Sequence, residues 1–139
     1  MIIVFVCTGN SCRSQMAEGL ANSIMGSNFI IKSCGFIPEK INRYAIDVMS
    51  EIGVDISHQE SSMIDKSMID MADMVVTLCG DAQGRCLSMI ESKTHIHWPI
   101  NDPAKFEGQE DEIRIEFRSA RDQIRSNINK LKETIRDKE

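Results

Sequence analysis

The sequence lacks any apolar run that approaches the roughly 20 residues needed to span a bilayer. It also lacks an excess of basic residues, because the 16 Lys and Arg are outnumbered by 21 Asp and Glu and the formal net charge is -5. This excludes a nucleic acid as the main partner, since no broad basic face is available to displace counterions. The chain does not open on a basic segment followed by a long apolar one, so we expect no secretion signal and predict a cytoplasmic location.

Cysteine is present in a number that does not suit a disulfide framework. The five cysteines form an odd set, and cytosolic proteins keep their thiols reduced. A nucleophilic or redox role is the better interpretation. The 139 residues contain no internal repeat, low-complexity tract or linker, which predicts a single domain over residues 1–139 and requires nothing beyond a monomer.

Segments typical of strands and helices alternate along the chain. We expect strands at 2–6, 29–34, 74–78 and 94–98, and helices at 14–25, 42–52, around 65–69 and from 111 to 135. Alternation of this kind predicts an α/β fold, with a four-stranded parallel sheet and helices on both faces. Functional residues in such a sheet gather at the carboxyl ends of the strands.

The most informative segment is residues 7–14, which connect the first strand to the first helix. A strand, a tight loop and a helix N-terminus form an anion site, because free backbone N–H groups and the helix dipole favour negative charge. Cys7 lies at the mouth of this site, which favours the thiolate form. We predict that Cys7 attacks a tetrahedral oxyanion, although a buried cysteine at the end of a strand is the ordinary alternative. The predicted oxyanion-binding residues are Thr8, Gly9, Asn10, Ser11, Cys12, Arg13 and Ser14.

Individual side chains of this loop have separate expected roles. Arg13 offers bidentate binding of oxyanion oxygens, and Ser14 can donate a hydrogen bond to the thiolate. Gly9 is expected to adopt a backbone conformation that residues with a Cβ avoid, and Asn10 to tie the loop to itself. Cys12 is expected to point into the structure, with a redox role as the minor alternative.

Two further segments carry reactive groups after strands. Cys79 follows the third expected strand, and the polar, glycine-containing stretch after it would let Cys86 approach. Beside an activated Cys7, this pair suggests a thiol–disulfide relay, whereas its spacing is wider than that of usual zinc sites. Asp102 follows the fourth strand and is a candidate general acid, the alternative being an ordinary turn aspartate.

The remaining cysteine and the histidines are given structural interpretations. Cys34 is expected to be a packed strand residue, and His58 a solvated loop residue. His95 and His97 are expected to face opposite sides of their strand and so not to share a metal ion.

With these residues together, the chain resembles the thioredoxin-coupled arsenate reductases of bacteria, which share the fold of low-molecular-weight tyrosine phosphatases. The match runs nearly end to end, through residues 7–19, 75–86, 97–104 and 121–124. The phosphatases share the pattern of residues 7–14 but lack the Cys79 and Cys86 pair. They also carry aromatic residues after Asp-Pro, where Ala104 and Lys105 stand here.

The resemblance implies a flavodoxin-like strand order and a specific chemistry. Cys7 would attack arsenate, Asp102 would protonate the departing oxygen, and the oxidation would pass as disulfides from Cys7 to Cys79 and then to Cys86. Thioredoxin would reduce the last disulfide. Some members bind potassium, and an ion near Asn10 and Glu18 is the one cofactor implied here, although residues 60–62 differ from the family's Thr-Ser-Asp stretch.

Two alternatives remain at this point. One is a phosphatase that uses Cys7, Arg13 and Asp102 through a phosphocysteine, an activity also expected as a side reaction of a reductase. The other is a non-enzymatic module that binds oxyanions or senses redox state. Thioredoxin-dependent turnover in variants of Cys79 and Cys86 distinguishes the three.

Overall fold

A computed structural model describes residues 1–78 and 94–137, so Cys79 and Cys86 lie outside the described residues. Within these ranges four strands form one parallel sheet in the order β2-β1-β3-β4. The strands are β1 (Ile2–Cys7), β2 (Ile30–Gly35), β3 (Met74–Thr77) and β4 (Thr94–His97). This confirms the predicted fold class, with boundaries that differ from the expected ones by about one residue.

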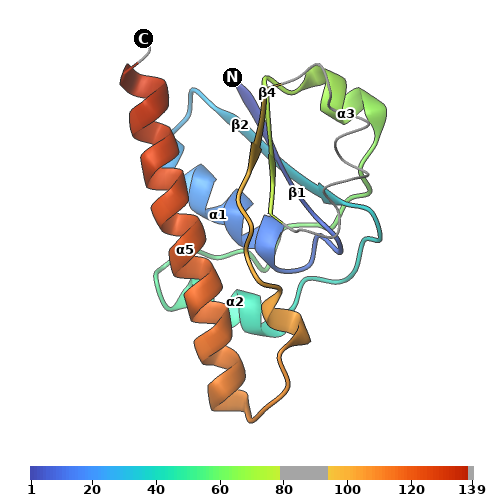
Figure 1. The fold of residues 1–139 in the computed structure, drawn as a ribbon, viewed down its shortest axis with the longest axis vertical. Coiled ribbons are helices and arrows are strands. Elements are labelled where there is room, and N and C mark those ends of the chain that lie inside the picture. The colour runs from blue at the N-terminus through green and yellow to red at the C-terminus, as the bar shows by residue number, and fades with distance from the viewer. Residues whose placement is uncertain (79–93, 138–139) are drawn as a thin grey trace.

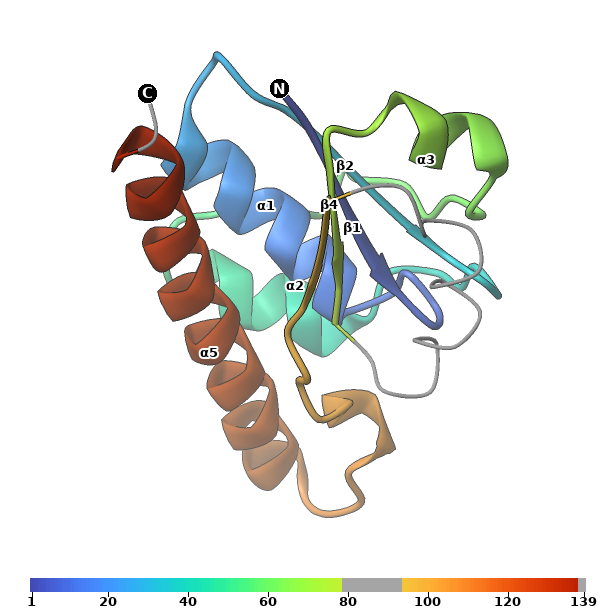
Figure 2. The same ribbon diagram turned by 45° about the horizontal axis from the view of Figure 1, so that its top comes forward.

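Helices cover both faces of the sheet (Figures 1 and 2). One face is covered by α1 (Arg13–Met25), α2 (Arg43–Ser50) and the long α5 (Glu110–Asp137), and the other by α3 (Lys66–Met71). A short 3-10 helix, η1 (Pro103–Lys105), follows β4. None of the helices in the described parts of the chain combines the length and apolar character needed to cross a membrane.

The central strand β1 is apolar because both of its faces are covered. Ile3 and Phe5 pack into the larger core beneath α1 and α5, whereas Val4 and Val6 pack into the smaller core with Cys34. A strand buried on both faces reads as a continuous apolar run, which residues 2–6 show. Cys34 is fully buried on β2, as predicted.

Side chains at helix ends explain where two of the helices begin. The Asn42 side chain accepts a hydrogen bond from the Tyr44 amide at 2.8 Å, and Asp65 accepts one from the Met68 amide at 2.7 Å. Asn42 and Asp65 are therefore the N-caps of α2 and α3, at the first residues of the two predicted helices. The helix α2 ends at Ser50, two residues before the predicted end, and the chain then turns through Gly53, where φ is +78°.

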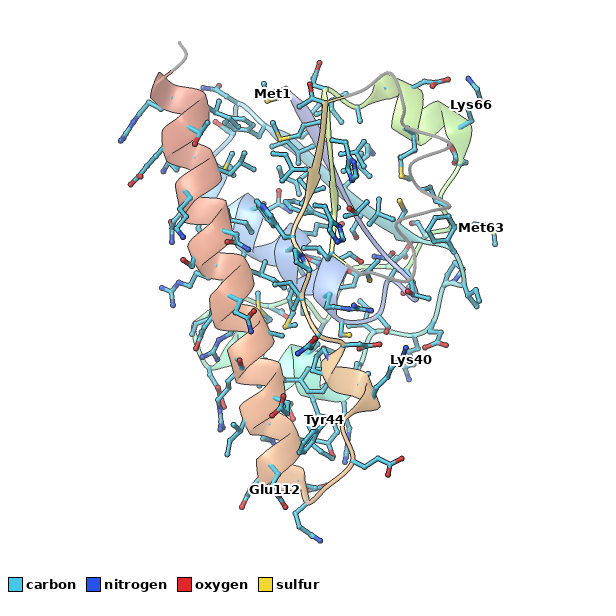
Figure 3. The ribbon with its side chains drawn as sticks, viewed as in Figure 1. Met1, Lys40, Tyr44, Met63, Lys66 and Glu112 are labelled. Carbon is cyan, nitrogen blue, oxygen red and sulfur yellow. The ribbon has the colours of Figure 1, made fainter. Side chains whose placement is uncertain are left out.

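Contacts between α2 and α5 close the layer over the larger core. Tyr44, labelled in Figure 3, projects from α2. Its ring lies beside that of Phe117 on α5, with 5.6 Å between the ring centroids. Glu51, at the end of α2, accepts hydrogen bonds from Arg118 and from the largely buried Arg121. The helix α1 packs against both β1 and α5 in the same layer. Its N-terminus lies near the carboxyl end of β1, because only a short loop separates Cys7 from Arg13 (Figure 2).

Candidate active site

A pocket of about 280 Å³ opens at the carboxyl end of β1, where the loop to α1 begins. It brings together three residues expected to act in chemistry, Cys7, Arg13 and Asp102. The other described residues that line it are Thr8, Gly9, Ser11, Cys12, Ile37, Glu39, Ala104 and Lys105. Asn10 and Ser14, which were also expected to bind the oxyanion, are fully buried behind the loop and do not line the pocket.

The conformation of the loop is imposed by a neighbouring segment, residues 37–42. This segment donates backbone hydrogen bonds of 2.9–3.0 Å to the carbonyl oxygens of Thr8, Gly9 and Ser11. Since a peptide group is planar, a carbonyl turned outward places the N–H of the same peptide on the opposite side. The arrangement therefore turns amides of the loop toward the pocket, as an anion site requires.

The residue of the loop with an unusual backbone conformation is Asn10, not Gly9. Among the described residues Asn10 is the non-glycine residue with positive φ, at 49°, and Gly9 has no positive φ. Asparagine tolerates this region, and here its side chain is anchored, with Nδ2 donating to Ser14 at 2.7 Å and Ser33 at 3.0 Å. The expectation for Gly9 was wrong because the side-chain bonds of Asn10 stabilise the left-handed conformation one residue later.

Gly35, at the end of β2, is required by close contact with the same loop. A Cβ at this position would lie 2.7 Å from the backbone nitrogen of Asn10 and 2.8 Å from the carbonyl oxygen of Thr8. No side chain can be accommodated at such distances without moving the loop backbone. This role could not be inferred from the sequence, because the two segments are distant along the chain.

Cys7 is buried at the end of β1 with a hydroxyl beside its sulfur. The Sγ atom lies 2.9 Å from Oγ of Ser14, in the first turn of α1. Oγ of Ser14 also accepts a hydrogen bond from Nδ2 of Asn10, and its own hydrogen is available to donate to a thiolate at the sulfur. A hydroxyl that donates to the thiolate favours that form, so the contact predicted between Ser14 and Cys7 is present.

Arg13 begins α1 and is almost completely buried. Its Nη1 donates to the carbonyl of Ile100 at 3.0 Å, and its Nη2 lies 3.4 Å from Oδ2 of Asp102. Its Nε is buried and has no hydrogen-bond partner among the described residues. A buried donor of this kind needs an acceptor, and an oxyanion oxygen in the pocket would supply one.

Asp102 is presented to the pocket by η1. Its carboxylate caps this short helix by accepting a hydrogen bond from the Ala104 amide at 3.0 Å. The same Oδ1 lies 3.5 Å from Sγ of Cys12. Burial, together with the charges of Asp102 and Cys7, raises the pKa of Cys12 to about 12, so this second thiol of the loop keeps its proton. Cys12 is buried, as predicted.

The two residues expected near a potassium ion, Asn10 and Glu18, are linked by hydrogen bonds through Ser33. Ser33 donates to Oε1 of Glu18 at 2.7 Å and accepts from Nδ2 of Asn10 at 3.0 Å. Burial raises the pKa of Glu18, against the opposing effect of the Ser33 hydrogen bond. Asn10 turns its amide nitrogen, which cannot bind a cation, toward this pair. Potassium binding stays a prediction, to be tested by comparing unfolding temperatures in potassium and sodium chloride.

His95 and His97 face the same side of β4, contrary to expectation. Oγ1 of Thr77 lies 2.8 Å from Nε2 of His95 and 2.7 Å from Nδ1 of His97. The expectation was wrong because side chains alternate along a strand with a period of two, so residues two apart share a face. Burial lowers the pKa of His95. Within the described ranges no three His, Cys, Asp or Glu side chains gather as a metal site.

Four lining residues were not proposed as site residues from the sequence, namely Ile37, Glu39, Ala104 and Lys105. Ile37 and Glu39 belong to irregular chain whose path no periodic pattern predicts. Lys105 could have been found from its position just after the Asp-Pro pair of the general acid. The remaining two predicted catalytic residues, Cys79 and Cys86, lie outside the described residues.

Comparisons with known proteins agree with this geometry. The family model described as low molecular weight phosphotyrosine protein phosphatase matches residues 2–139. An arsenate reductase from Halalkalibacterium halodurans is 44% identical over 133 residues, which cover 96% of each chain. A solved structure of an arsenate reductase in the phosphate binding state is 34% identical, with a TM-score of 0.80 over 96% of this chain and 98% of that one.

A further solved structure is a thioredoxin-dependent arsenate reductase from Corynebacterium glutamicum. It is 27% identical, with a TM-score of 0.74, and the match covers 99% of this chain and 63% of that one. Together with the pocket formed by Cys7, Arg13 and Asp102, these matches show that the chain belongs to the low molecular weight phosphotyrosine protein phosphatase family.

Proposed function

We propose that this protein reduces arsenate to arsenite, with Cys7 as the nucleophile. The observation that supports this best is the pocket in which Cys7, Arg13 and Asp102 meet, in a chain that is 44% identical to an arsenate reductase over nearly its full length. Arsenate is a tetrahedral oxyanion, the kind of ligand that a helix N-terminus and a buried arginine bind.

The first step forms a bond between Sγ of Cys7 and arsenic and breaks an arsenic–oxygen bond. The Ser14 hydroxyl favours the attacking thiolate, and Arg13 with the loop amides stabilises the charge on the oxyanion oxygens. Asp102, at the rim of the same pocket, gives its proton to the departing oxygen, which leaves as water.

The second step transfers the electrons. The Cys79 thiolate attacks Sγ of Cys7, the sulfur–arsenic bond breaks, and its electron pair stays on arsenic, which leaves as arsenite. Cys86 then attacks Cys79, which frees Cys7 and leaves a Cys79–Cys86 disulfide. Thioredoxin returns two electrons to this disulfide. The roles of Cys79, Cys86 and thioredoxin rest on the sequence motif and on the likeness to the thioredoxin-dependent reductase.

The test is NADPH oxidation that depends on arsenate, thioredoxin and thioredoxin reductase. The wild type should turn over, whereas Cys79→Ser and Cys86→Ser should each lose turnover and keep hydrolysis of an aryl phosphate. Cys34→Ser is the matched control, because it removes a buried thiol from β2 outside the pocket. Full turnover in both relay variants would refute the proposal.

A phosphatase acting through a phosphocysteine is the second candidate, favoured by the matched family itself. Its weakness is the pocket wall, where none of the described lining residues is aromatic and Ala104 and Lys105 follow the Asp-Pro pair. A phosphatase would hydrolyse aryl phosphates with the same rates in all three cysteine variants. A redox sensor would form disulfides but turn over neither substrate.

The cytoplasmic location and the monomeric state belong to the same proposal. A thiol relay that thioredoxin regenerates works in a reducing compartment, which supports the cytoplasm. Size-exclusion chromatography of the reduced protein tests the monomer.

A further inference from the structure

Cys12 occupies a position where its side chain has an unusual partner. It is the N-cap residue of α1, yet its side chain makes no capping hydrogen bond to that helix. Side chains at N-cap positions normally accept a bond from the first turn. The Sγ of Cys12 is instead 3.5 Å from Oδ1 of Asp102, a residue 90 positions further along the chain.

Both carboxylate oxygens of Asp102 are contacted by consecutive residues, the N-cap residue Cys12 and the first helical residue Arg13. Sγ of Cys12 contacts Oδ1 of Asp102, and Nη2 of Arg13 lies 3.4 Å from Oδ2. The two contacts differ in character. The contact from Arg13 is an ion pair, whereas that from Cys12 is a hydrogen bond from a neutral thiol, which keeps its proton because burial and the nearby charges raise its pKa to about 12.

Only one of these contacts can persist unchanged when an oxyanion enters. The oxyanion accepts hydrogen bonds from the guanidinium of Arg13, whose Nε has no partner among the described residues. The positive charge of Arg13 is then divided between the oxyanion and Asp102. The incoming negative charge also disfavours an ionised carboxylate, so in this proposal Asp102 takes up a proton as the oxyanion enters, and this is the proton that it gives to the departing oxygen. The Cys12 thiol carries no charge, so the oxyanion competes for its hydrogen bond to Asp102 far less than for the charged guanidinium of Arg13.

We propose that Cys12 is a positioning residue, whose S–H holds Asp102 over the pocket after Arg13 turns to the substrate. The carboxyl group of Asp102 is then already oriented toward the departing oxygen when the proton is transferred. This inference rests on the proposed function, since it assigns a role within the same proton transfer.

The test uses the pair Cys12→Ala and Cys12→Ser, of which the serine keeps a donor. The substrates are two aryl phosphates, one with a basic leaving group that needs a proton (phenyl phosphate) and one that does not (2,4-dinitrophenyl phosphate). We expect Cys12→Ala to lower kcat for phenyl phosphate about fivefold to tenfold with KM unchanged, the loss of one weak bond to a carboxylate. The dinitrophenyl ester should be unaffected, and Cys12→Ser should restore kcat to within about twofold.

The effect must also depend on Asp102. In an Asp102→Asn background, Cys12→Ala should lower kcat no further, because residues that act through one another are not additive. An equal loss in both backgrounds, or an equal loss with both esters, would show a merely structural effect and overturn the proposal.

A measurement without turnover separates this inference from the proposed function. The side-chain carboxyl ¹³C signal of Asp102 should move in Cys12→Ala and return in Cys12→Ser, and an unmoved signal overturns the inference. Absence of arsenate reduction in the wild type would defeat the proposed function alone. Cys34→Ala serves as the control for removing a buried thiol.

Discussion

At the scale of single residues, the two cysteines of the pocket, Cys7 and Cys12, have different neighbours. Cys7 lies 2.9 Å from a serine hydroxyl whose hydrogen is free to donate. Cys12 lies beside the carboxylate of Asp102, and its pKa is raised to about 12. This difference supports the proposals that Cys7 is the nucleophile and that Cys12 donates a hydrogen bond to Asp102.

Replacing Ser14 by alanine should slow the reaction of Cys7 with an alkylating reagent. The variant loses the hydroxyl that donates to the thiolate, so at about pH 6 the rate of alkylation by iodoacetamide should fall about tenfold. At strongly alkaline pH, where every thiol is ionised, the rates should converge. Ser23→Ala, an exposed change on the same helix, is the matched control. Equal rates at acidic pH would contradict the role of Ser14.

The local part of this site could be predicted from the sequence. Cys7, Arg13 and Ser14 were found because the loop and the helix start are contiguous, and the spacing of their side chains follows from that geometry. The contact between Cys12 and Asp102 could not be found, because it joins residues that only the sheet topology brings together.

At the scale of elements, the shape of the oxyanion loop comes from its neighbours more than from its own glycine. Residues 37–42 hold three of its carbonyls, and Gly35 lets β2 approach its backbone. The strands and longer helices were predictable from periodicity. Residues 37–42 were not, since irregular chain carries no periodic signal and its path is set by hydrogen bonds to a distant loop.

A comparison of two glycine variants tests this view. In Gly35→Ala the new methyl group would meet backbone atoms at 2.7–2.9 Å, so the free energy of unfolding should fall by about 2 kcal/mol. In Gly9→Ala it would meet only side-chain atoms, at 3.4–3.7 Å, and the loss should stay below about 0.5 kcal/mol. Urea denaturation measures both. A larger loss for Gly9→Ala would show that the loop depends on its own glycine after all.

At the scale of the whole molecule, Glu51 links α2 to α5 over the larger core. Hydrogen bonds from Arg118 lower the pKa of Glu51 to about 2, although its partial exposure screens the interaction. A carboxyl whose pKa is lowered by folding stabilises the folded state above its unfolded value of about 4.3. That stability is lost as the pH falls from there toward about 2.

Replacing Glu51 by glutamine should therefore destabilise the protein in a pH-dependent way. At neutral pH the free energy of unfolding should fall by about 1 kcal/mol, since the exposed ends of the network contribute little. The difference from the wild type should shrink as the pH drops below about 4.3. Denaturation curves at several pH values measure it, with Glu133→Gln, at an exposed position of α5, as the control. A difference that persists at the acid end would show that Glu51 acts through packing and not through charge.

The architecture at this scale was largely predictable, whereas the hydrogen bonds and ion pairs that join α2 to α5 were not. Alternating strands and helices indicate a parallel sheet with helices on both faces, and the apolar spacing of α5 indicates which face it buries. The burial of Arg121 was not foreseen, because an arginine at an apolar position of a helix pattern gives no sign of the carbonyl and carboxylate that receive it.

The ion pair between Arg13 and Asp102 has a consequence for which ligands the protein retains. The Asp102 carboxylate, tethered beside the guanidinium, competes with any bound anion for Arg13 at an effective concentration in about the millimolar range or above. Each bound anion must compete with the Asp102 carboxylate for Arg13. Weakly bound anions therefore dissociate quickly, and the pocket retains those that also interact with the sulfur of Cys7. The Asp102 carboxylate pairs with Arg13 again as the anion dissociates, which speeds product release.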